Sequence, residues 1–309
     1  MFRKSVLLAC GLSFSFSGLA LAASGAQAPE QQVQAVEGAR KINPAAVEVL
    51  LGKNQRMTFD FYGDNVFRIF RDDKGGIIRD PKEAKILVDN PRKPVSKLDV
   101  DQKDGVVTIT TGKIRIEIDK KTSLLKIINL KDNSVVVEQA SPVLFEKGKT
   151  SFSLKANPDE YFYGGFSHKG KVISIENQNS WTDGGVASPT PFYWSTNGYG
   201  VMWHTFKKGQ YDFGSKEKNL VNLQHDEDYL DVFFMVNDGA VSLLGDFYQL
   251  TGAPVLLPKF AFYQGHLNAY NRDYWKEDEK GILFEDGKRY KESQKDNGGI
   301  KESLNGEKD

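Results

Sequence analysis

The sequence has 309 residues, with 41 Lys and Arg against 41 Asp and Glu, so its formal charge is zero. A neutral chain offers no basic surface for the phosphates of nucleic acid or for an anionic membrane, which argues against both as partners. The length is enough for one large or two medium domains, and the 20 Phe and 12 Tyr residues suit a β-rich core or stacking on sugar rings.

The first residues predict a secretory signal peptide over residues 1–22. Arg3 and Lys4 give a positive start, an uncharged apolar segment follows, and Ala20-Leu21-Ala22 matches a small-x-small cleavage site. Cys10, the only cysteine, lies inside this signal and leaves lipoprotein acylation open as an alternative to ordinary cleavage. We expect an exported protein, periplasmic or secreted, without a membrane span or a thiol after signal removal.

Residues 23–40 are rich in Ala, Gln and Gly and predict a flexible lead-in. From residue 41 to residue 258 the pattern predicts mostly strands. Apolar and polar residues alternate around Met57 and around Ile114, which places one side of each strand in a core and the other in water. The continuous apolar run Val232–Val236 instead predicts a strand buried on both faces.

Turn signals separate these short strands, and this spacing is typical of a sandwich or barrel. The clearest is Asn197-Gly198, which predicts a tight hairpin between residues 192–195 and 201–206. Val241, Leu244 and Phe247 recur at helical spacing, so residues 240–250 are predicted as one helix that closes the β domain.

A new unit is predicted after Pro258. Phe260–Gly265 has the pattern of a strand. Residues 276–309 are dominated by Lys, Glu, Asp and Gly, so this stretch is predicted to be a solvated insertion or tail.

The polar stretch from Glu176 to Gly185 is the main functional candidate. Trp181 offers a flat face to sugar C–H groups, and Asp183 can accept paired hydrogen bonds from hydroxyls. The residues alone favour a simple turn, because Asp-Gly-Gly is turn chemistry.

The sequence predicts no metal site and no cofactor. The histidines show no metal-ligand spacing; they are His168, His204, His225 and His266. Gly165–Lys171 has the spacing of a phosphate-binding loop, but Val172 stands where Ser or Thr is needed and a strand pattern follows where a helix should begin.

Several motifs occur in a recognisable order: Tyr161–Gly165, the loop with Trp181 and Asp183, Pro191–Tyr193, Asn197–Gly200 and Leu257–Phe262. Over roughly residues 45–275 this order resembles the amino-terminal region of glycoside hydrolase family 31, the α-glucosidase and α-xylosidase group. The resemblance implies a mainly β fold, a galactose-mutarotase-like β-sandwich over residues 41–258, followed by a (β/α)8 barrel.

The resemblance also implies roles for individual residues. Asp183 falls where a sandwich loop supplies an aspartate that holds the sugar, with Trp181 as its aromatic neighbour. Phe260–Gly265 would be the first barrel strand. His266 would then lie near its carboxyl end, the face on which barrels build active sites. The implied ligand is an α-linked oligosaccharide or glucan.

Family members hydrolyse with retention, using two carboxyl groups about 5 Å apart. Both lie late in a barrel of about 250 residues, whereas 51 residues follow Pro258 here. We therefore expect residues 259–309 to be the start of a truncated barrel, and we assign no catalytic residue in this chain.

Two other functions remain open. One is a stand-alone carbohydrate-binding β-sandwich. The other is an aldose epimerase-like enzyme, because the sandwich type is shared; this chemistry needs a histidine and a carboxylate on one face, with His168 or His204 as the histidine. A purely structural domain is a third possibility, and the oligomeric state is not predicted.

Overall fold

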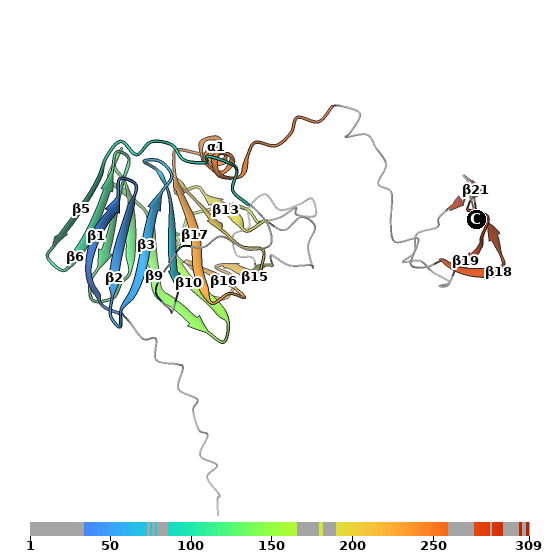
Figure 1. Ribbon diagram of the computed structural model, residues 1–309, viewed down its shortest axis with the longest axis horizontal. Coiled ribbons are helices and arrows are strands. Elements are labelled where there is room, and N and C mark those ends of the chain that lie inside the picture. Colours follow the sequence, from blue (N-terminus) through green and yellow to red (C-terminus); the bar gives the residue numbers. More distant parts are fainter. Residues whose placement is uncertain are drawn as a thin grey trace, which may run out of the picture. The chain divides into compact units, whose positions relative to one another are not determined.

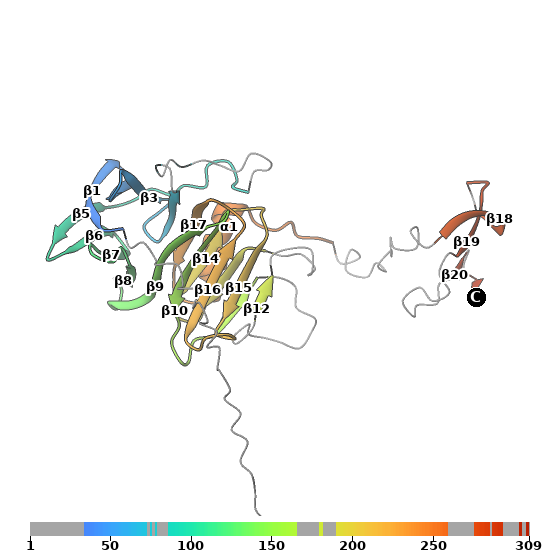
Figure 2. The same cartoon turned by 90° about the horizontal axis from the view of Figure 1, so that it is seen from below.

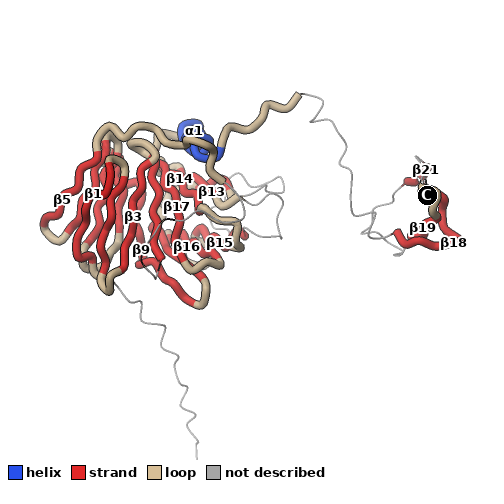
Figure 3. Tube along the Cα trace, in the orientation of Figure 1, coloured by secondary structure: helices blue, strands red, loops and turns tan. Residues whose placement is uncertain are grey.

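A computed structural model describes residues 34–72, 75, 78, 86–165, 179–181, 190–258, 275–284, 286–292, 303–304 and 307–308. The chain divides into two compact units, Met1–Ala253 and Pro254–Asp309. In the described part of the first unit nearly all regular structure is strand, and α1 (Ala240–Thr251) is the one helix (Figure 3).

An eight-stranded antiparallel sheet forms one layer of the first unit (Figure 1). The pairing of β4 with β17 brings together segments that lie far apart in the sequence. In spatial order the strands are β1 (Val36–Asn43), β2 (Ala46–Leu51), β3 (Gln55–Phe61), β4 (Val66–Asp72), β17 (Tyr229–Val236), β14 (Tyr199–Trp203), β13 (Phe192–Ser195) and β11 (Phe162–Gly164).

A nine-stranded antiparallel sheet forms the second layer, with β12 and β5 at its opposite ends (Figure 2). In spatial order the strands are β12 (Asn179–Trp181), β15 (Gly209–Phe213), β16 (Leu220–His225), β10 (Lys149–Lys155), β9 (Ser134–Glu146), β8 (Leu125–Asn129), β7 (Ile114–Asp119), β6 (Val106–Thr111) and β5 (Leu98–Lys103).

The two sheets pack face to face around one apolar core, so the predicted β-sandwich is confirmed. The ring of Phe152 on β10 lies 5.5 Å from Trp203 and 6.4 Å from Phe234, which both belong to the other sheet. The core includes the two sets predicted from alternation: Met57, Phe59, Phe61, Ile114, Ile116 and Ile118.

Helix α1 packs on the outer face of the eight-stranded sheet. Leu243 and Leu250 of α1 join Phe233 and Met235 of β17 in a second apolar cluster. The run Val232–Val236 is therefore buried on both faces, as predicted.

The Asn197-Gly198 hairpin is confirmed between β13 and β14. Gly198 has φ +84°, a conformation that glycine adopts without a Cβ clash. The second strand begins at Tyr199, two residues earlier than predicted, because Ser195 pairs directly with Tyr199.

The first strand begins inside residues 23–40, the stretch that was predicted to be a flexible lead-in. Strand β1 starts at Val36 and pairs with β2. Most of its side chains are exposed or half-buried, so no apolar alternation signals it in the sequence. Backbone pairing with β2, burial of Val36 and the Arg40–Glu48 ion pair hold this edge strand.

The second unit contains two small hairpins within its described residues. One joins β18 (Trp275–Leu283) to β19 (Arg289–Glu292), and the other joins β20 (Ser303–Leu304) to β21 (Glu307–Lys308). Nearly all of both hairpins falls within residues 276–309, the stretch predicted to be a solvated insertion or tail. The predicted barrel strand Phe260–Gly265 lies outside the described residues.

Candidate functional site

Backbone hydrogen bonds join the end of β11 to the start of β13, on either side of a segment of which the structure describes only β12. Gly165 N donates to Phe192 O at 2.7 Å, and Thr190 N donates to Gly165 O at 2.7 Å. The ends of the intervening segment are therefore held side by side at the edge of the eight-stranded sheet.

Gly164 makes this closure possible. Its φ is +109°, and a Cβ built there would lie 2.8 Å from Phe192 O and 3.0 Å from Tyr193 Cα. A side chain at this position would push β11 away from β13, so the glycine is required by both conformation and space.

The same segment touches the other sheet through β12. Asn179, Ser180 and Trp181 pair with Asp212, Tyr211 and Gln210 of β15. Among the described strands β12 is the last of its sheet, so the backbone of Trp181 lies in the edge strand of that described sheet.

A buried carboxyl group supports the start of β11. Glu160 is 4% exposed, accepts a hydrogen bond of 2.5 Å from Ser195 Oγ and another of 2.9 Å from Asn157 N. Burial raises the pKa of Glu160 above its usual value. The adjacent Tyr161 and Thr196 exchange further hydrogen bonds, which tie β11 to the β13–β14 hairpin.

An aromatic surface follows the outer side of β11 and β13. The rings of Tyr163 and Trp194 stack with centroids 4.4 Å apart, and Tyr161 is 45% exposed. This pair was not predicted from the sequence, although the alternation of Tyr161, Phe162 and Tyr163 indicates that two of the three rings face away from the core.

A groove of about 270 Å³ lies next to the return point, with Thr190, Pro191, Phe206 and Phe247 in its walls. Its lining is mostly apolar. The hydroxyl of Thr251, also in the wall, already donates to Phe247 O. Lys207 is the charged side chain among the described residues of the wall, so the groove is mainly an apolar surface.

A family model described as "Glycosyl hydrolase 31 N-terminal galactose mutarotase-like domain" matches residues 56–212, half of the chain. The chain belongs to this family. The match runs from β3 to β15 and so contains β11, β12 and the segment between them.

Curated relatives of this glycosyl hydrolase 31 domain include α-xylosidases. The α-xylosidase XylQ of Lactiplantibacillus pentosus is 24% identical over 205 residues, which are 61% of this chain and 26% of the relative. The α-xylosidase of Emericella nidulans is 26% identical over 188 residues, which are 57% of this chain and 24% of the relative. The chain thus spans about a quarter of the length of these relatives.

Solved structures share the fold. The GH31 dextranase of Flavobacterium johnsoniae, complexed with glucose, matches with a TM-score of 0.67 and 19% identity, over 75% of this chain and 30% of that one. A GH31 α-xylosidase from a soil metagenome, complexed with xylose, matches with a TM-score of 0.61 and 18% identity, over 72% of this chain and 36% of that one. These likenesses confirm the galactose-mutarotase-like β-sandwich.

The predicted substrate-binding residues of the glycosyl hydrolase 31 domain are described only in part. The structure gives the backbone of Trp181 in β12, whereas Asp183 and His266 lie outside the described residues. Their roles remain predictions. For Trp181 and Asp183 the structure describes β12 and the hydrogen-bonded ends, Gly165 and Thr190, of the segment that contains them.

His204, the described candidate for epimerase chemistry, is buried. Its side chain is 2% exposed, and its Nδ1 lies 3.1 Å from Asp231 and 3.2 Å from Arg68. A sugar in solvent has no access to this ring, so His204 is removed as an acid or base; His168 lies outside the described residues.

His225 is buried as well. It contacts the Tyr211 hydroxyl at 2.8 Å, and burial lowers its pKa to about 4, so the ring is neutral at physiological pH. Among the described residues no group of three or more His, Cys, Asp or Glu side chains is placed to share a metal ion. In the same part of the chain, no helix is long and apolar enough to cross a membrane.

Proposed function

We propose that this chain is the sugar-contacting amino-terminal portion of an exported retaining α-glycosidase that acts on α-linked glucans or oligosaccharides. In this proposal the catalytic carboxylates do not belong to these 309 residues. Family membership supports the sandwich's place at the amino-terminal side of a glycosidase. The names of the curated relatives, both α-xylosidases, support α-linked sugar units as the substrate class.

The observation that carries the proposal is the anchoring of the segment between Gly165 and Thr190. Its two ends are hydrogen-bonded to each other on one sheet, and its middle, β12, is paired with the edge of the other sheet. These three described attachment points support a role for the segment in ligand contact, because anchored attachment points reduce the conformational entropy that is lost on binding.

Within this loop we assign sugar contact to two residues. Trp181 would supply an aromatic face for the C–H groups of a sugar ring, and Asp183 would accept hydrogen bonds from two neighbouring hydroxyls. His266 is a further proposed substrate-binding residue, beyond Phe260–Gly265.

The buried carboxylates of the described sandwich already have structural partners. Glu160 bonds Ser195, Glu227 bonds Thr205, Asp231 pairs with Arg68 and Asp246 bonds Asn65. Their burial leaves them unsuited to serve as a glycosidase nucleophile or acid. This supports the proposal that these described carboxylates do not perform the hydrolysis.

Titration of the purified 309-residue chain with xylose- and glucose-containing α-linked oligosaccharides, followed by saturation-transfer NMR, tests the binding role. We expect weak, saturable binding that is lost in Asp183→Asn and Trp181→Ala. Asp159→Asn, an exposed position in the turn before β11, is the matched control and should bind as wild type. Binding that is unchanged in both loop variants would contradict the assignment.

The export part of the proposal rests on the signal pattern of residues 1–22. Expression of the whole sequence in a Gram-negative host, followed by fractionation and amino-terminal sequencing, tests it. The proposal expects a mature chain that begins near Ala23 outside the cytoplasm. A cytoplasmic chain that retains Met1 would contradict it.

A further inference from the structure

Arg71 is a buried cation without a carboxylate partner among the described residues. It follows Phe67 and Ile69 at a spacing of two on β4, so its side chain points between the sheets, and it is 5% exposed. One terminal nitrogen donates to Gln34 Oε1 at 2.8 Å, and the guanidinium carbon lies 5.4 Å from the centre of the Phe145 ring. Within the described part of the chain, Nε is buried with no hydrogen-bond partner.

Other arginines of the sandwich are neutralised by carboxylates. Arg68 and Arg92 lie 2.6 Å from Asp231 and Asp60. Even the half-exposed Arg56 lies 3.2 Å from Glu48. The contrast shows that the charge of Arg71 requires a separate explanation, because an uncompensated buried charge is strongly unfavourable.

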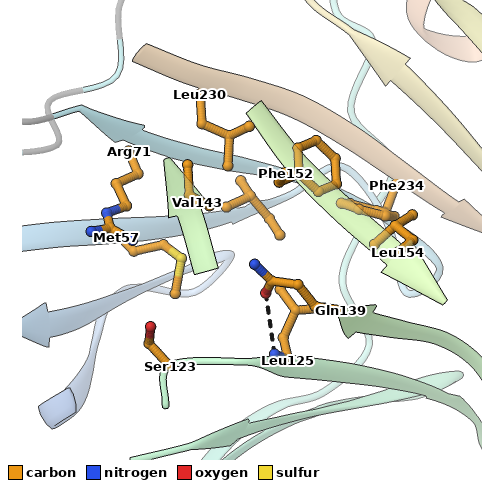
Figure 4. Close-up of a pocket in the computed structure, with 11 residues that line it drawn as sticks. Met57, Arg71, Ser123, Leu125, Gln139, Val143, Phe152, Leu154, Leu230 and Phe234 are labelled. Carbon is orange, nitrogen blue, oxygen red and sulfur yellow. Dashed lines mark hydrogen bonds between the residues drawn. The ribbon is translucent and has the colours of Figure 1, made fainter. Parts of the chain in front are cut away.

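A cavity of about 20 Å³ adjoins Arg71 between the two sheets (Figure 4). Apolar side chains, among them Leu125 and Phe152, form most of its walls. Figure 4 shows the hydroxyl of Ser123 and the amide nitrogen of Gln139 directed toward the space beside the guanidinium. This volume holds one water molecule or one ion of similar size.

The polar lining of the cavity consists of hydrogen-bond donors. The Gln139 carbonyl is occupied because it accepts a hydrogen bond of 3.3 Å from Leu125 N. Gln139 Nε2 donates to Ser141 O at 2.7 Å and has a second hydrogen to offer. Among the described residues that line the cavity, none carries a carboxylate.

We propose that this cavity is a binding site for a small monovalent anion of the halide class, held by Arg71 Nε, Ser123 Oγ and Gln139 Nε2. A water molecule would satisfy the hydrogen bonds but would leave the positive charge uncompensated. A tetrahedral oxyanion such as sulfate is too large for the space. Burial lowers the pKa of Arg71 to about 10, so the guanidinium remains charged at neutral pH and still attracts an anion.

Thermal unfolding of the whole 309-residue chain tests the site. Sodium bromide is titrated against sodium gluconate at constant ionic strength, since gluconate is too large to enter. We expect Tm to rise saturably by about 5–10 °C once bromide reaches about a hundred times its dissociation constant. Equal Tm values in the two salts would overturn the proposal.

Variants separate this site from general salt effects. Arg71→Met should remove the dependence of Tm on bromide, whereas Arg56→Met, which removes an exposed arginine from the neighbouring strand, should retain it. If Arg71→Met does not fold, Ser123→Ala provides the second variant. Loss of one hydrogen bond to the anion should raise the bromide midpoint about tenfold, and an unchanged midpoint would overturn the role of Ser123.

Anomalous diffraction from crystals grown in bromide locates the ion directly. The proposal expects an anomalous peak within hydrogen-bonding distance of Arg71 Nε. Water density without an anomalous peak at this position would overturn it, whatever the thermal data show.

Discussion

Arg68 and Asp231 form a bidentate ion pair on the outer face of the eight-stranded sheet, with both contacts at 2.6 Å and side chains only 3% and 0% exposed. The pair joins β4 to β17 and so connects the first part of the sandwich with its last strand.

Asp231→Asn should destabilise the domain by about 3–5 kcal/mol, because it leaves the Arg68 charge buried without a counterion. The double variant Asp231→Leu with Arg68→Met should recover much of this loss. Urea unfolding gives both values. A loss below about 1 kcal/mol in Asp231→Asn would show that the pair is not the main compensation for Arg68.

The raised pKa of Glu160 predicts that the stability of the domain depends on pH. Burial raises its pKa above the usual 4.5, so the stability associated with this group is fully present below pH 4.5 and falls as the pH rises through the folded-state pKa. Glu160→Gln stays neutral. We therefore expect the unfolding free energy of Glu160→Gln, relative to wild type, to increase between pH 4 and pH 7. A constant difference over this range would contradict the raised pKa.

Asp119 should give the opposite pH dependence of the unfolding free energy. Hydrogen bonds from Thr122 and Lys121 lower its pKa, so its stabilising effect is present above the unfolded-state pKa and is lost as the pH falls. Asp119→Asn should therefore be less stable than wild type at pH 7 and approach it in acid. Paired urea titrations at the two pH values measure the difference.

Gly164→Ala should destabilise the sandwich by at least about 2 kcal/mol, because the added Cβ meets the backbone of β13 and the residue has a positive φ. Gly245→Ala is the matched control: it lies in α1 with open space around it, so it should stabilise by up to about 1 kcal/mol. Thermal or urea unfolding compares the two. Equal effects would show that Gly164 is not needed to close the loop.

The sequence predicted α1 almost residue for residue and part of the face that it buries, since Leu244 and Phe247 pack half-buried against the sheet. Val241 was part of the predicted apolar stripe and is 86% exposed, whereas Leu243 and Asp246 are buried. Asp246 faces the sheet because it accepts hydrogen bonds from Asn65 and Asn237, which lie at the end of neighbouring strands. Helical periodicity cannot reveal such partners, because they come from distant parts of the chain.

The candidate site was predictable only in part for a related reason. Trp181 was identified from loop composition and family resemblance, and its strand emerged only through pairing with Gln210 of β15. Stacking between Tyr163 and Trp194 depends on the register of β11 against β13, which local sequence does not specify. Arg71, which has no carboxylate partner among the described residues, could not be identified as a buried charge before the sheets were brought together, since charge alone does not show burial.

Release of nitrophenol from an α-glycoside tests whether these 309 residues contain the catalytic carboxylates. The purified 309-residue chain is incubated with p-nitrophenyl α-xyloside and p-nitrophenyl α-glucoside, and the absorbance of released nitrophenol is compared with buffer alone. If, as we propose, the catalytic carboxylates do not belong to these 309 residues, no release above buffer is expected. Saturable release that is abolished by substitution of a carboxylate within this chain would contradict it.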